Sequence, residues 1–240
     1  MGVSGITREL LELNEERALL FSWDLSEFAR IIQDVGFFCV ECGKCCTAPF
    51  NGHVFLLDQD ASRALQLCPD SLIPAPEFEL CDEEGNFYVS GYAVRVHPDG
   101  ACVHLSEGRC TIYEDRFTIC RVYPYMLHRE HDSRKRNEFR QISGLNEHGV
   151  YHNQIRDVDA LRIAKETYGY EMAWLIQMIR FYEAVDQILT KSGQRYIRRV
   201  YDKRIQEFRK GAPVQVFVWY NGSFVSHEVR FSEYAGFGWP

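Results

Sequence analysis

The sequence FFCVECGKCC, residues 37–46, carries four of the nine cysteines of the chain. A second block follows with Cys102, Cys110 and Cys120, and it ends in CRVYP at residues 120–124. Thiols spaced three residues apart can offer several sulfurs to one metal centre, and Gly43 allows tight backbone close to it. We therefore predict that the two blocks close on a shared metal site.

The predicted ligands are the seven cysteines of the two blocks: Cys39, Cys42, Cys45, Cys46, Cys102, Cys110 and Cys120. Soft thiolates select zinc, copper(I) or iron–sulfur clusters over hard cations. Seven sulfurs exceed the four that a tetrahedral zinc ion or one [4Fe-4S] cluster takes. The pattern leaves open either two centres or a single centre with further thiols around it. We expect Cys68 and Cys81 to lie outside the site.

Simpler metal motifs do not fit this spacing. The bacterial ferredoxin run needs a fourth cysteine where Pro49 stands here. The paired histidines of a zinc finger do not follow the first block in the expected window. The two blocks must therefore be interpreted together.

Together, the blocks resemble a known family, the YkgJ-like cysteine cluster proteins, which are described as zinc- or iron-chelating. The resemblance covers roughly residues 36–130, and it is carried by CxxCxxCC at 39–46, GACVHL at 100–105, GRCTIYEDR at 108–116 and CRVYP at 120–124. It implies that these cysteines are the metal-site residues. It also implies an iron–sulfur cluster, [4Fe-4S], as the cofactor, with zinc as the alternative metal.

Two departures from the family pattern stand out. The family has Arg-Pro where this chain has Arg116-Phe117, and many members carry Cys-x-Gly where this chain has QISG at residues 141–144. The first departure changes a turn, and the second removes one candidate ligand. The family also includes a flagellin lysine methylase, which implies a protein substrate and S-adenosylmethionine by analogy. The sequence shows no glycine-rich strand–turn–helix for that cofactor.

Other side chains beside the cysteines have two interpretations each. Arg121, which follows Cys120, is predicted to donate hydrogen bonds to a cluster sulfide or to an anionic substrate, and a salt bridge to an acidic side chain is the alternative. His104 is a candidate ligand, although an ordinary hairpin histidine is the favoured interpretation. Tyr113 and Tyr123 are predicted to pack around the site and to exclude water.

Composition narrows the class of protein. The 240 residues are 46% hydrophobic and 25% charged, with a net charge of −7. The acidic balance disfavours broad nucleic-acid binding, and acidic residues interrupt every long apolar stretch, so we expect no membrane span. Glutamates within the first 20 residues argue against a signal peptide. We expect a cytoplasmic location, where clustered cysteines bind metal more often than they form disulfides.

The periodicity predicts helices and short strands in alternation. Helices are expected over residues 6–21, 25–35 (between Asp24 and Gly36), 58–67 (capped by Asp58), 154–168, 170–190 and 194–210. Strands are expected over residues 52–57, 78–81, 87–96, 125–130 and 138–142. Hairpins are expected around residues 106–108 and at 214–220 and 223–231 with an Asn221-Gly222 turn, and residues 68–78 are expected to form a loop.

We expect an α+β protein with a metal-binding domain over residues 1–150 and a C-terminal helical segment with a β-hairpin over residues 151–240, packed as one unit. Two hypotheses follow for its function. In the first, the metal takes part in modification of a protein substrate, with lysine methylation as the family analogy. In the second, an iron–sulfur or zinc centre stabilises a non-catalytic module for binding or metallocentre maturation.

Overall fold

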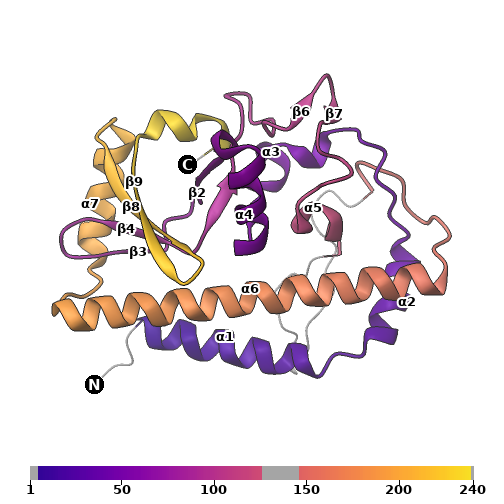
Figure 1. Ribbon diagram of the computed structural model, residues 1–240, viewed down its shortest axis with the longest axis horizontal. Helices are drawn as coiled ribbons and strands as arrows, with labels where there is room; N and C mark the ends of the chain where they lie inside the picture. The colour runs from indigo at the N-terminus through magenta and orange to yellow at the C-terminus, as the bar shows by residue number, and fades with distance from the viewer. Residues whose placement is uncertain (1–4, 126–145, 239–240) are drawn as a thin grey trace. The chain divides into compact units, whose positions relative to one another are not determined.

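The computed structural model describes residues 5–125 and 146–238, and the fold is α+β as predicted (Figure 1). In these residues the α-helices are α1 (Gly5–Phe21), α2 (Leu25–Val35), α3 (Ala48–Asn51), α4 (Asp58–Leu67), α5 (Thr118–Val122), α6 (Asp157–Ser192) and α7 (Arg198–Arg209). The strands are β1 (Phe55–Leu56), β2 (Leu72–Pro74), β3 (Leu80–Cys81), β4 (Phe87–Val89), β5 (Tyr92–Val94), β6 (Leu105–Ser106), β7 (Arg109–Cys110), β8 (Val214–Tyr220) and β9 (Ser223–Val229). Short 3-10 helices cover Lys44–Cys46, Pro69–Ser71 and Phe231–Phe237.

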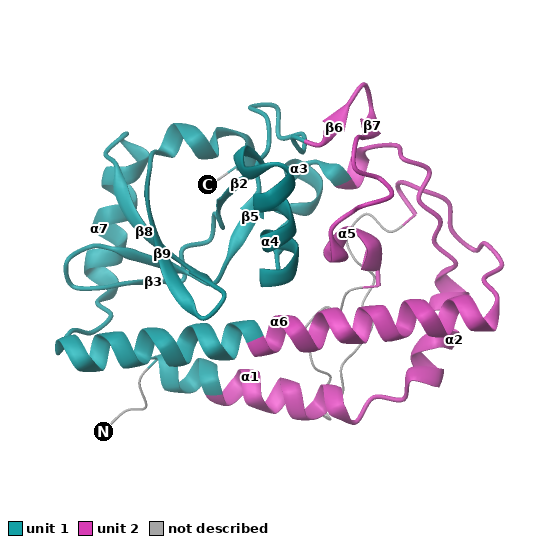
Figure 2. Ribbon diagram, viewed as in Figure 1, with its two compact units in different colours: residues 1–10, 46–103, 177–240 teal, residues 11–45, 104–176 magenta. Residues whose placement is uncertain are grey.

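The chain divides into two compact units, each assembled from separate stretches of sequence (Figure 2). Unit 1 contains residues 1–10, 46–103 and 177–240, and unit 2 contains residues 11–45 and 104–176. The domain boundary expected at residue 150 stays a prediction.

Unit 1 is built on two small sheets. One has the strand order β1-β5-β2 and is antiparallel, with Ala93 opposite both Phe55 and Ile73. The other has the order β3-β4-β8-β9, in which only the β4–β8 pair is parallel. Phe87 of the second sheet packs on Phe78, which precedes β3, and their ring centroids lie 4.8 Å apart. Burial of this apolar surface stabilises the unit.

Unit 2 is organised by helix α2 and the first part of α6. The Asp24 carboxylate accepts the backbone N–H of Ser26, and Gly36 ends α2 in the left-handed conformation. A Cβ at Gly36 would lie 2.5 Å from the Asn153 carbonyl oxygen, so only glycine fits this close approach. The core of the unit consists of Phe28, Ala29, Ile32, Tyr125, Ala160 and Ala164. Gly36 leads the chain directly into the first cysteine block.

Several predicted elements are confirmed with small shifts. Helices α1, α2 and α4 match their expected ranges, and α7 begins at Arg198 rather than at residue 194. The hairpin β8–β9 has its expected turn at Asn221-Gly222, where both residues have positive φ. The strands expected over residues 125–130 and 138–142 fall almost wholly outside the described residues.

Other expectations were wrong. The two helices expected over residues 154–168 and 170–190 are one continuous helix, α6 (Asp157–Ser192), which passes through Gly169 on an exposed face. Residues 72–74 form the buried strand β2 instead of a loop. The strand expected over residues 87–96 is split at Ser90-Gly91 into β4 and β5, which belong to different sheets. Asp58 is not the cap of α4: its own N–H is satisfied by the side-chain oxygen of Gln177, 2.9 Å away.

Candidate metal centre

The seven predicted ligand cysteines fall into both units. Cys39, Cys42, Cys45, Cys110 and Cys120 belong to unit 2, and Cys46 and Cys102 belong to unit 1. All nine cysteines of the chain are thiols rather than disulfides. Cys42 is exposed and the other six predicted ligands are half-buried, so each of the seven sulfur-bearing residues retains access to solvent.

The first cysteine block of unit 2 packs on the β6–β7 hairpin. Gly43 has φ of 72°, and a Cβ placed on it would lie 3.2 Å from the Leu105 side chain. Leu105 is paired with Cys110 across the hairpin. Lys44, next to Gly43, forms an ion pair of 3.2 Å with Glu147. The glycine therefore lets the block lie flat on the hairpin that carries Cys110.

Tyr113 connects the hairpin segment to Cys39. Burial raises the pKa of Tyr113, and the negative charge of Cys39 in its thiolate form raises it further through a hydrogen bond with the Tyr113 hydroxyl. The Arg116 guanidinium lies 3.8 Å above the Tyr113 ring, and its Nε donates to the Tyr113 carbonyl oxygen over 2.8 Å. A stacked cation of this kind fixes the orientation of the ring. The prediction that Tyr113 packs by the site agrees with this contact.

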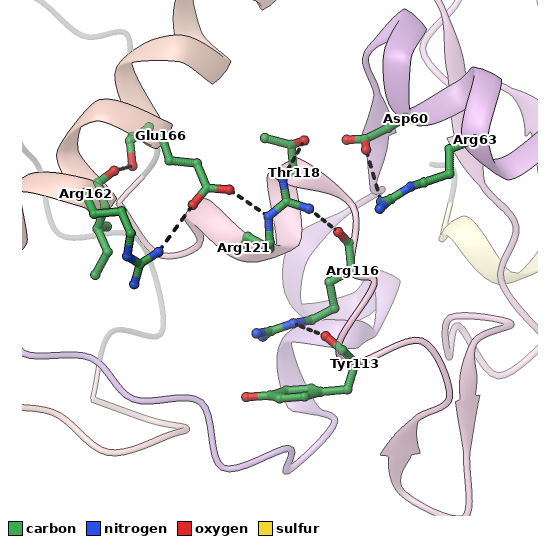
Figure 3. Close-up of polar contacts among 10 residues, drawn as sticks. Asp60, Arg63, Tyr113, Arg116, Thr118, Arg121, Arg162 and Glu166 are labelled. Atoms are coloured by element: carbon green, nitrogen blue, oxygen red, sulfur yellow. Dashed lines mark hydrogen bonds and ion pairs between the residues drawn. The ribbon is translucent and has the colours of Figure 1, made fainter. Parts of the chain in front are cut away.

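Arg121 lies one residue after Cys120 on the short helix α5, and it donates hydrogen bonds to three groups of unit 2 (Figure 3). Its Nε donates to a Glu166 carboxylate oxygen over 2.6 Å, and Nη2 donates to the Thr118 hydroxyl over 3.2 Å. Nη1 donates to the carbonyl oxygen of Arg116. The salt bridge that we weighed as the alternative is thus present. A contact between Arg121 and a cofactor stays a prediction.

A cluster of aromatic rings adjoins the first cysteine block. The Phe37 ring lies 5.8 Å from that of Tyr123, 5.9 Å from that of His148 and 5.2 Å from that of Tyr151. Burial raises the pKa of Tyr151, and the charges of Cys45 and Cys42 raise it further. Phe37, the first residue of the block, is therefore part of this aromatic cluster.

His104 is a functional candidate whose burial the sequence did not predict. It is 7% exposed, and its Nε2 atom is buried without a hydrogen-bond partner. Its ring lies 5.8 Å from that of Phe117. Burial lowers the pKa of His104, so the imidazole is favoured in its neutral form. An ordinary hairpin histidine would hold its polar tip in water, and this one does not.

The two ligand candidates of unit 1 are joined through their backbones. The Cys102 N–H donates to the Cys46 carbonyl oxygen over 2.9 Å, next to the bridge between Thr47 and Ala101. Cys81 is buried, and its thiol donates to the Asp82 carbonyl oxygen. Burial raises the pKa of Cys81 to about 12, which disfavours the thiolate that a metal needs.

The donor chemistry fits a thiophilic metal, because unit 2 alone contains five cysteines that are exposed or half-buried and form no disulfide. In residues 5–125 and 146–238, no group of three or more His, Cys, Asp or Glu side chains is already arranged around a common metal position. The chemical identity of the donors therefore supports metal binding. The side chains would take up the coordination geometry when the metal binds.

These features define a cysteine-rich metal-binding region. Residues 38–143 match the model of the family CxxCxxCC, which is described as "Putative zinc- or iron-chelating domain", so this part of the chain is similar to that family. The expected family assignment is confirmed. No curated protein and no solved structure gives a significant match.

The length and hydropathy of the helices bear on whether any of them could span a membrane. None of those in the described part of the chain is both long and apolar enough to cross a lipid bilayer.

Proposed function

We propose that unit 2 binds a metal centre through cysteine thiolates and that this centre is an iron–sulfur cluster of the [4Fe-4S] type. One observation carries the proposal: five of the seven predicted ligands, Cys39, Cys42, Cys45, Cys110 and Cys120, belong to one compact unit and none is in a disulfide. A [4Fe-4S] cluster takes four thiolates, so four of these five suffice. Cys46 and Cys102 stay predicted ligands from the sequence.

The surroundings of the thiols favour a cluster over zinc. The predicted donors are all sulfur atoms. Tyr113 lies beside Cys39. Tyr151 lies beside Cys42 and Cys45. Hydroxyl donors and apolar rings next to thiolates are the means by which proteins set the reduction potential of a cluster. When bound, such a cluster supplies one-electron transfer. The family description names both zinc and iron and supports metal binding without choosing between them.

The test is anaerobic purification followed by assays of iron, zinc and acid-labile sulfide and by a visible absorption spectrum. We expect a coloured protein with iron and sulfide in equal amounts. A colourless protein with stoichiometric zinc and no sulfide contradicts the cluster while leaving metal binding intact. A protein without metal contradicts the whole proposal.

Serine substitutions test which block binds the metal. Cys42→Ser and Cys120→Ser should each lose metal, because serine replaces a soft thiolate by a hydroxyl that stays protonated. The matched control is Cys68→Ser, since Cys68 is exposed and lies outside both blocks. Full metal occupancy in either block variant shows that the corresponding block does not bind.

Protein modification rests on the family resemblance alone. We propose a protein substrate on that basis, with lysine methylation as the reaction and S-adenosylmethionine as the methyl donor. Calorimetric titration of the metal-loaded protein with S-adenosylmethionine checks the cofactor, and the absence of binding heat contradicts it. A metal centre that only stabilises a binding or maturation module is then the surviving hypothesis.

A further inference from the structure

The Arg121 side chain joins three segments of unit 2 (Figure 3). Its Nε donates to a Glu166 carboxylate oxygen of α6 over 2.6 Å, and its Nη2 donates to the Thr118 hydroxyl, in the first turn of α5, over 3.2 Å. Its Nη1 donates to the carbonyl oxygen of Arg116, which precedes α5. A planar guanidinium can hold several acceptors at once in a fixed geometry. Arg121 therefore fastens α5 to α6 and to the loop before it.

A second set of contacts continues from Arg116 to the first cysteine block. The Arg116 guanidinium lies 3.8 Å above the Tyr113 ring, and its Nε donates to the Tyr113 carbonyl oxygen over 2.8 Å. The Tyr113 hydroxyl makes a hydrogen bond with Cys39. Cys120 directly precedes Arg121 on α5. A continuous series of contacts within unit 2 therefore runs from the segment that bears Cys120 to Cys39.

Glu166 gives Arg121 a fixed support. Ala160 and Ala164, on the same stretch of α6, are fully buried in the core of unit 2. Arg162 also approaches the Glu166 carboxylate, at 3.9 Å, and its side chain is 65% exposed, compared with 35% for Arg121. Partly exposed ion pairs of this kind contribute little to the stability of a protein. The Arg121–Glu166 pair is therefore better suited to orient α5 than to stabilise unit 2.

We infer that Arg121 is a positioning residue that, held by Glu166, sets where Cys120 lies relative to Cys39 for metal binding. This inference rests on the proposed function, because it requires that the two cysteines bind one centre. Residues that hold metal ligands in the productive geometry strengthen binding without touching the metal. Arg121 then acts through Cys120 and not by contact with the cofactor.

The first experiment adds a chelator to the protein as purified anaerobically and follows the release of its metal. Arg121→Gln and Glu166→Ala should release the metal about 10–100-fold faster than the wild type, the usual effect of losing such a contact. Glu166→Gln should release it like the wild type, because the amide oxygen still accepts the Arg121 Nε hydrogen bond. Arg162→Gln is the matched control: it removes a positive charge from the same carboxylate, leaves Arg121 in place and should match the wild type.

These variants distinguish positioning from two simpler roles. If Arg121 contacted the cofactor itself, Glu166→Ala would leave metal release unchanged, since the guanidinium would still be present. If only charge mattered, Glu166→Gln would release the metal as fast as Glu166→Ala. Either result overturns the inference.

Arg121→Lys is a second variant of the same position, and it keeps the test open if Arg121→Gln does not fold. Lysine keeps the positive charge but lacks the planar fork that holds three acceptors, so we expect faster metal release than in the wild type. Release at the wild-type rate in a folded Arg121 variant overturns the inference and leaves the proposed function intact. A wild type that contains no metal overturns the proposed function and the inference together.

Discussion

Two of the hairpins in the described residues, β6–β7 and β8–β9, use the same turn conformation but differ in what supports them. In β8–β9 the turn is Asn221-Gly222, with φ of 47° and 82°, and seven residue pairs follow in register. In β6–β7 the turn is Glu107-Gly108, with φ of 51° and 77°, and two residue pairs follow. Two pairs do not make a stable hairpin in water.

The difference shows which part of the chain stabilises itself. β8 also pairs with β4, and Val216 and Val218 of β8 are fully buried. β6 and β7 have no further strand beside them in the described sheets, and their residues are half-buried or exposed. The hairpin β6–β7 is supported instead by the cysteine block that lies on it. If that block binds metal, the metal becomes part of what holds unit 2 together.

The largest expected effect is on the stability of the sheet β3-β4-β8-β9 of unit 1. Phe87→Ala removes a fully buried ring of β4 that packs on Phe78. We expect a loss of about 3–5 kcal/mol in the free energy of unfolding of unit 1. Under conditions where the variant is folded, its metal content should equal that of the wild type. Denaturant unfolding and metal analysis check this. A loss of metal in the folded variant would show that metal binding depends on the sheet of unit 1.

A second prediction concerns pH and the same sheet. Burial raises the pKa of Glu79, which precedes β3, to about 7, although hydrogen bonds from Ser90 oppose the shift. Between pH 4.5 and about 7 the unfolded chain ionises this carboxyl while the folded chain keeps it protonated, so stability falls as pH rises. Below that window both states are protonated, and the penalty vanishes.

Glu79→Gln removes this dependence and keeps an acceptor for Ser90. The stability of the wild type should fall relative to that of the variant by roughly 2–3 kcal/mol across the window, since one pKa unit corresponds to about 1.4 kcal/mol. Denaturation curves at several pH values check this. Parallel pH profiles of the two proteins would contradict the burial of the charge.

The smallest expected effect is the change in stability when the non-glycine residue of each turn is replaced by glycine. Glu107 holds a positive φ without glycine, so Glu107→Gly should stabilise unit 2 by up to about 1 kcal/mol. Asn221 tolerates this conformation, and its N–H and side-chain amide bond to Asp58 and Ser62. Asn221→Gly should therefore be neutral or destabilising. Thermal unfolding distinguishes the two, and equal gains would show that the turns carry the same strain.

Local signals predicted much of the fold. Asp24 and Gly36 bound α2, and Asn221-Gly222 closes β8–β9, because caps and tight turns depend on adjacent residues. The errors came where tertiary packing decides. Residues 72–74 form a strand because β5 pairs with them. The split between β4 and β5 was missed because both strands are buried on both faces, so the hydrophobic pattern does not change from one strand to the next.

For the candidate site, spacing and family resemblance predicted the residue types but not their surroundings. The pairing of Arg121 with Glu166 joins residues 45 positions apart, and no local pattern could reveal it. The burial of His104 depends on Phe117 in another segment. The boundary of the compact units between Cys45 and Cys46 likewise follows from three-dimensional contacts and not from sequence.

The central claim is that metal supports the cysteine-bearing segments of unit 2 and leaves the β8–β9 sheet unaffected. Amide hydrogen exchange, measured on protein purified anaerobically and on the same protein after removal of its metal by a chelator, tests it directly. We predict that residues 39–45 and 104–120 lose protection on metal removal, while residues 214–229 keep theirs. Unchanged protection of the cysteine-bearing segments would contradict the account.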